Sequence, residues 1–126
     1  MDLSLSLVLV VEDSPLIRMG AVASIVEAGF LTFEAGGADE AIQILEGRPD
    51  IQLVFTDVEM PGSMDGIALA QCIWSRWPSI KLIVTSGRTV AEKRDLPPGA
   101  RFFPKPYDGQ AIVEAVIAML KDPWPG

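Results

Sequence analysis

The chain has 126 residues, 49% of them hydrophobic, which is enough for one compact domain with a packed core and leaves no room for a second domain. The chain has no histidine and a single cysteine, Cys72. It therefore cannot form an internal disulfide, a histidine-dependent catalytic triad or one of the usual zinc sites. The net charge of −7 argues against binding to nucleic-acid backbones or anionic lipid. Any chemistry must therefore rest on carboxylates, hydroxyl groups, lysine or a hard metal ion.

The first half of the chain alternates apolar runs with amphipathic runs. The opening apolar run is too short to cross a bilayer and lacks a basic flank, so it predicts a strand and not a signal peptide. Ser14-Pro15 suits the N-cap and first position of a helix that ends at Gly29. The predicted strands are 5–11, 31–35 and 53–56, and the predicted helices are 15–28 and 38–46. The first of these helices has Ile17, Ala21, Ile25 and Ala28 on one face.

The second half continues the alternation less regularly. Its predicted elements are a helix from Asp65 to Pro78, strands at 81–85 and 101–103, and a helix at 111–120. In the helix after Asp65, one face is expected to carry Ile67, Ala70, Ile73, Trp74 and Trp77. Residues 87–99 have the poorest pattern, so at most a short or irregular helix fits there. Two prolines exclude a continued helix in the tail, 122–126.

Five strands that alternate with helices predict an α/β fold: a doubly wound parallel sheet with helices on both faces. The run Leu7 to Val11 supports this prediction, because strands covered on both faces are continuously apolar. Ligands of such sheets bind in the crevice beyond the carboxyl ends of the strands. The residues that follow each strand are therefore the candidate site.

Five polar side chains follow the predicted strands, and the sheet would gather them at one edge. They are Glu12 and Asp13 after the first strand, Asp57 after the third, Ser86 after the fourth and Lys105 after the fifth. Taken singly, each has an ordinary explanation, such as a helix cap, a turn residue or a solvated charge. Their joint occurrence at one edge favours a functional site.

The chemistry expected of this cluster is phosphoryl transfer. Clustered carboxylates stay ionised only beside positive charge, and Mg²⁺ prefers oxygen ligands. The metal would screen Asp57 from an incoming phosphoryl group, which Lys105 and Ser86 would also contact. A carboxylate is already a nucleophile, so no general base is needed.

Four short motifs carry a resemblance that covers essentially the whole chain. They are VVEDS at 10–14, TDVEMPG at 56–62, VTSG at 84–87 and FFPKP at 102–106. In their order and spacing they resemble the receiver domain of two-component response regulators. The resemblance implies a flavodoxin-like strand order 2-1-3-4-5, a receiver domain at 1–121 and a C-terminal tail at 122–126.

The resemblance also implies a role for each matching residue. These are Asp57 as phosphoacceptor; Glu12, Asp13, Asp57 and the backbone carbonyl of Glu59 as ligands of Mg²⁺; Lys105 beside the phosphoryl group; Ser86 and Phe102 as the switch pair; and the side chains of Glu59 and Arg88 as groups that tune dephosphorylation. For Phe102, a purely structural place in the core is an equally good interpretation. The wide apolar band of the last helix is either a thick core contact or a face for a partner or self-association.

Three functions compete. The first is a signalling phosphoacceptor, not an enzyme, that takes its phosphoryl group from a histidine kinase or histidine phosphotransfer protein in the bacterial cytoplasm. The start at Met1 and the proline-rich end favour a free-standing single-domain protein for this role. The second is a receiver-like scaffold that is never phosphorylated. The third is a magnesium-dependent phosphatase with an aspartyl intermediate, in which Glu59 would be the second acid.

Overall fold

The computed structural model describes residues 6–62, 64–87 and 96–121. Strands and helices alternate along the chain as the hydrophobic pattern predicts. The elements are β1 (Leu7–Val11), α1 (Pro15–Glu27), β2 (Leu31–Ala35), α2 (Ala38–Gly47), β3 (Leu53–Asp57), α3 (Gly66–Arg76), β4 (Lys81–Ser86), β5 (Arg101–Pro104) and α4 (Gly109–Lys121). The expected short or irregular helix after Gly87 and the tail 122–126 fall largely or wholly on residues outside this description.

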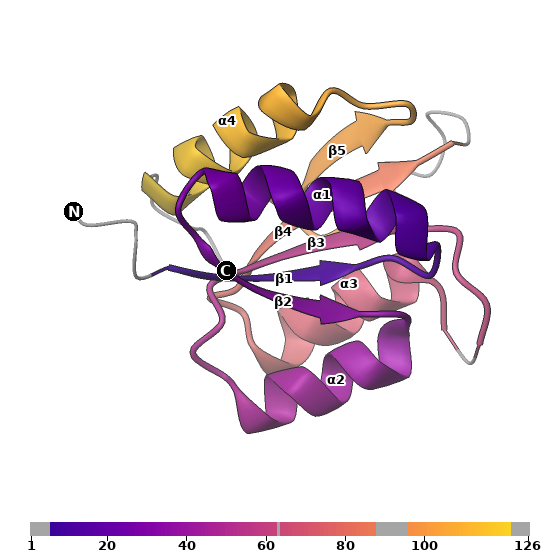
Figure 1. The fold of residues 1–126 in the computed structure, drawn as a ribbon. Helices are drawn as coiled ribbons and strands as arrows, with labels where there is room; N and C mark the ends of the chain where they lie inside the picture. The colour runs from indigo at the N-terminus through magenta and orange to yellow at the C-terminus, as the bar shows by residue number, and fades with distance from the viewer. Residues whose placement is uncertain (1–5, 63, 88–95, 122–126) are drawn as a thin grey trace.

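The five strands form one parallel sheet in the order β2-β1-β3-β4-β5, which confirms the predicted fold class (Figure 1). At its carboxyl edge, Val11 pairs with Thr56, Asp57 with Thr85, and Ser86 with Pro104. This register brings the ends of β1, β3, β4 and β5 to one edge. The residues that follow these strands are therefore neighbours.

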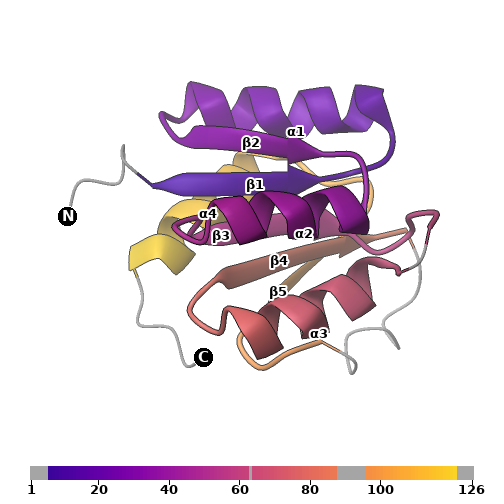
Figure 2. The same cartoon turned by 90° about the horizontal axis from the view of Figure 1, so that it is seen from below.

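Two helices cover each face of the sheet. Helices α1 and α4 lie on one face and α2 and α3 on the other, as the two views show (Figures 1 and 2). The strands divide their side chains between the two layers: in β1, Leu9 and Val11 pack toward α2 and α3, while Val8 and Val10 pack toward α1 and α4. All five residues of β1 are buried, as expected for a strand covered on both faces.

Side-chain caps set the start of two helices. The Ser14 Oγ accepts a hydrogen bond from the amide of Ile17 at 3.4 Å, and the Asp65 carboxylate accepts one from the amide of Ala68 at 2.9 Å. Each bond satisfies one of the amide groups that a first helical turn leaves unpaired. Both predicted helix starts are confirmed.

The apolar faces predicted for α1 and α3 are only partly buried. In α1, Ala21 and Ile25 are buried, but Ile17 in the first turn is exposed, as is Ala28, which follows the last residue of the helix. In α3, the buried residues are Gly66, Leu69, Ala70 and Ile73. Trp74 lies at the edge of this buried face, with 37% of its surface exposed.

Helix α4 packs its apolar band on the domain. Ile112, Val116, Met119 and Leu120 are buried, and Val113 and Ile117 are half-buried. This burial favours the interpretation of a thick core contact, and self-association through α4 stays a prediction. Among the residues that the structure describes, no helix has the length and apolar character needed to cross a bilayer.

Candidate functional site

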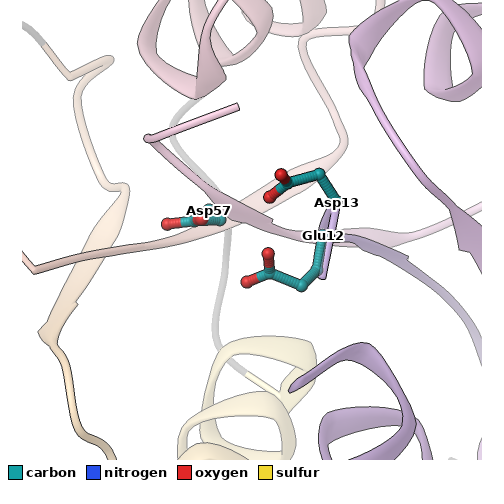
Figure 3. Close-up of side chains that lie close together, drawn as sticks. All are labelled: Glu12, Asp13 and Asp57. Carbon is teal, nitrogen blue, oxygen red and sulfur yellow. The ribbon is translucent and has the colours of Figure 1, made fainter. Parts of the chain in front are cut away.

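Three carboxylates meet at the carboxyl edge of the sheet. Glu12 and Asp57 are 3% and 2% exposed, and Asp13 is exposed. One oxygen from each of the three lies within 4.8 Å of the other two, and their side chains point toward a common space (Figure 3). The cluster predicted from the sequence is therefore assembled from the ends of β1 and β3.

Lys105 provides the positive charge of this cluster. Its Nζ lies 3.0 Å from Asp57 Oδ2 and 3.3 Å from Glu12 Oε1. Its backbone amide donates to the carbonyl of Ser86 at 2.9 Å, which ties the segment after β5 to the end of β4. Asp57 Oδ1 is buried and has no hydrogen-bond partner among the described residues. One oxygen of Asp57 is thus held by Lys105, and the other is left for a ligand.

The electrostatics of the site follow from burial and mutual repulsion. Burial raises the pKa of Asp57, the bond and charge of Lys105 oppose the rise, and the charge of Glu59 adds to it. Burial likewise raises the pKa of Glu12, with Asp13 and Asp57 contributing. Burial alone would lower the pKa of Lys105, but the two carboxylates outweigh it and leave that pKa raised. The cluster therefore carries more negative charge than one lysine balances.

This arrangement fits a divalent cation. Three carboxylates that converge on one space, one of them with an unpartnered buried oxygen, are the hard oxygen ligands that Mg²⁺ prefers. Glu12, Asp13 and Asp57 are the residues that could hold it. The backbone carbonyl of Glu59 as a further ligand stays a prediction.

The side chain of Glu59 bridges two loops in a way that the sequence did not suggest. Its Oε2 accepts a hydrogen bond from the Ser86 hydroxyl at 2.6 Å, and its Oε1 accepts one from the amide of Gly87 at 2.8 Å. The two loops are 27 residues apart in sequence, and no local pattern encodes their contact. Arg88, the other residue expected to tune dephosphorylation, lies outside the described residues.

Arg18 is a second contact that sequence reasoning missed. Its Nη1 donates to the backbone carbonyl of Glu12 at 2.7 Å, and its Nε pairs with Glu34 Oε1 at 3.2 Å. The residue therefore ties the segment that carries the acidic pair to strand β2. The sequence contains one signal for this contact, a basic residue one turn into the helix that follows a strand. This pattern is common in proteins, so it is a weak signal.

Phe102 is half-buried and packs against the core cluster under α2 and α3. This position agrees with a core residue and is equally compatible with a side chain that turns. Its role as a switch stays a prediction.

A groove borders the site on the side of α1. It has a volume of about 530 Å³ and runs between α1 and the segment from Lys105 to Gly109. Leu16 and Ile17 of α1 line it and are 80% and 41% exposed. Because Lys105 lines the groove and also contacts Asp57, the groove opens beside the carboxylate cluster.

A family model described as the response regulator receiver domain matches residues 8–117. The chain belongs to the receiver domain family. The sensor kinase CckA of Brucella abortus (strain 2308) is 38% identical over 118 residues, which are 90% of this receiver domain and 12% of that kinase. A putative NtrX-like response regulator of Rickettsia felis is 29% identical over 84% of this domain and 23% of its own length. The chain thus spans less than a quarter of each of these relatives.

Solved structures agree with this assignment. The receiver domain of the hybrid histidine kinase CckA superposes with a TM-score of 0.79 at 29% identity, over 92% of this receiver domain and all of that chain. A response regulator receiver protein from Pseudomonas putida gives a TM-score of 0.82 at 31% identity, over 90% of this domain and 97% of that chain.

Gly66 supports the backbone of Asp57, and a Gly66→Ala substitution tests this support. A Cβ at Gly66 would clash with the carbonyl oxygen of Asp57 and lie 2.8 Å from the Cα of Val58, so the backbone must move. We expect a loss of about 1–3 kcal/mol in the free energy of unfolding, measured by urea denaturation. Gly20→Ala is the control: a Cβ at this helical position meets nothing within 4 Å, so stability should rise by about 0.5–1 kcal/mol. Equal stability of Gly66→Ala and wild type would contradict the account.

Asp57→Asn tests the cost of burying a charged carboxylate in the cluster. A carboxyl whose pKa is raised by folding binds its proton more tightly in the folded state, so its contribution to stability is present at low pH and falls as pH rises through that pKa. From about pH 4 upward, in the absence of divalent cations, we expect Asp57→Asn to unfold at higher temperature than wild type, and its stability to fall less with pH. Lys105 keeps Glu12 as a partner in this variant. A less stable Asp57→Asn at pH 7 would show that burial and repulsion do not outweigh the bond to Lys105.

Proposed function

We propose that this receiver domain accepts a phosphoryl group on Asp57 with Mg²⁺ held by Glu12, Asp13 and Asp57, and that the new charge changes its conformation. The observation that carries the proposal is the convergence of three carboxylates within 4.8 Å of one another, with Lys105 3.0 Å from Asp57, in a member of this family. Domains of this kind signal as phosphoacceptors and do not turn over substrates as ordinary enzymes do.

The reaction needs little covalent chemistry from the protein. A carboxylate oxygen of Asp57 attacks the phosphorus of a phosphohistidine, the P–N bond breaks, and the departing imidazole keeps the bond's electron pair and takes a proton from solvent. When bound, Mg²⁺ would offset the charge of the carboxylates and of the phosphoryl oxygens. Lys105 is close enough to Asp57 to contact a phosphoryl oxygen, and Ser86 offers a hydroxyl on the neighbouring strand end.

The proposed phosphodonor is a histidine kinase or a histidine phosphotransfer protein in the cytoplasm. The groove beside α1 supports a protein donor. Apolar residues line it together with Lys105, and Lys105 contacts Asp57, so a protein bound in the groove would lie next to the phosphoacceptor. Leu16 and Ile17 expose apolar surface there, and such surface is typical of an interface.

The two other functions have weaker support. A scaffold that is never phosphorylated would not need Glu12, Asp13, Asp57 and Lys105, yet all four are present and lie together. A phosphatase would need Glu59 as a second acid. The carboxylate of Glu59, however, accepts hydrogen bonds from the Ser86 hydroxyl and from the backbone amide of Gly87.

Acetyl phosphate with Mg²⁺ tests the proposal. We expect the intact protein to gain the mass of one phosphoryl group, and we expect no gain for Asp57→Ala or in excess EDTA. Mass spectrometry at neutral pH provides the measurement. No modification of the wild-type protein would favour the scaffold, and continuous hydrolysis of unrelated phosphate esters would favour the phosphatase.

A Leu16→Asp variant tests the groove as the donor's contact. We expect phosphotransfer to slow by about tenfold or more with the histidine kinase or phosphotransfer protein that reacts fastest with wild type, because a buried apolar contact is lost. The rate with acetyl phosphate should not change, since a small donor needs no groove. Val26→Asp, exposed near the other end of α1, is the matched control. Equal slowing by both variants, or none, would contradict this contact.

A further inference from the structure

The carboxylate of Glu59 occupies a small anion site built by the end of β4. The site has two donors, the hydroxyl of Ser86 and the backbone amide of Gly87, and each binds a different oxygen of the carboxylate, at 2.6 and 2.8 Å. Ser86 is fully buried and Glu59 is half-buried. Both bonds have an ionised acceptor, which makes them stronger than bonds between neutral groups.

The same two donors lie beside the proposed phosphoacceptor. Asp57 pairs with Thr85 in the sheet, and the amide of Val58 donates to the carbonyl of Thr85 at 2.9 Å. Ser86 and Gly87 directly follow Thr85 and therefore lie at the edge where Asp57 ends its strand. A phosphoryl group on Asp57 would bring further anionic oxygens into reach of these donors.

We propose that Glu59 is an internal latch, whose carboxylate holds the Ser86 hydroxyl and the Gly87 amide until a phosphoryl group on Asp57 displaces it. The proposal rests on the proposed function and adds a competition to it. Each donated hydrogen serves one strong acceptor at a time, so phosphorylation and the Glu59 bonds compete. The latch keeps the end of β4 in its unphosphorylated position and lowers the affinity for a phosphoryl group.

Displacement of this carboxylate is feasible. Glu59 is only half-buried and can return to water, so its release does not strand a charge in the core. Gly87, whose amide is the second donor, is also exposed. A phosphoryl dianion carries more charge than the carboxylate and is the stronger acceptor.

Beryllium fluoride, a phosphoryl analogue, tests the latch in the full chain with excess Mg²⁺. We expect Glu59→Ala to bind it about tenfold more tightly than wild type, since no Glu59 carboxylate competes for the two donors. Glu59→Gln, which removes the charge and keeps an amide oxygen for one donor, should fall between them. Glu27→Ala, an exposed carboxylate near the far end of α1, controls for net charge and should match wild type. Isothermal titration calorimetry measures the affinities.

The free protein gives a second readout. In spectra without beryllium fluoride, the Gly87 amide proton of Glu59→Ala should move upfield from its wild-type position as its hydrogen bond is lost. Two results would overturn the latch without contradicting the phosphoacceptor function. In one, wild type binds beryllium fluoride and Glu59→Ala binds it no more tightly; in the other, Glu59→Ala and Glu59→Gln gain the same affinity. An unmoved Gly87 signal would also overturn the latch. Failure of every variant to bind beryllium fluoride would overturn both proposals.

Discussion

The contact between Lys105 and the buried carboxylates of Asp57 and Glu12 is the interaction on which the site depends. One ammonium group contacts two acidic side chains that are almost fully buried, and a third carboxylate, that of Asp13, lies beside them. Burial raises the pKa of both buried acids, so the ionised cluster costs stability that the rest of the fold must supply. A protein would keep so costly an arrangement for a function that uses its charge.

The parallel sheet makes this arrangement possible by register alone. Strands β1, β3, β4 and β5 end at one edge, and their next residues meet without any dedicated binding domain. Close packing then sets the positions. Gly66 lies directly against the backbone of Asp57, Arg18 holds the carbonyl of Glu12, and the amide of Lys105 is bonded to the end of β4. These contacts connect the site to both helical layers.

Much of this could be predicted from the sequence, because helix caps and strand-end residues are encoded locally and the resemblance to receiver domains implied the strand order. Ser14 and Asp65 cap the predicted helices, and Glu12, Asp13, Asp57 and Lys105 meet as expected. The exposure of Trp74 and the bonds of Glu59 were not predictable, because they depend on how whole elements pack. The spacing of apolar residues along a helix identifies its apolar face. Which residues of that face are buried depends on how the helix packs on the neighbouring layer.

The binding of Mg²⁺ to the unphosphorylated protein tests the central claim most directly. We predict that calorimetric titration at neutral pH finds one site in the wild-type protein. In Asp13→Asn, whose side chain keeps its shape but loses its charge, the affinity should fall by about tenfold or more. The exposed control Glu27→Gln should bind as wild type does. Unchanged affinity in Asp13→Asn, or no binding by the wild-type protein, would contradict the account of a carboxylate cluster neutralised by a divalent cation.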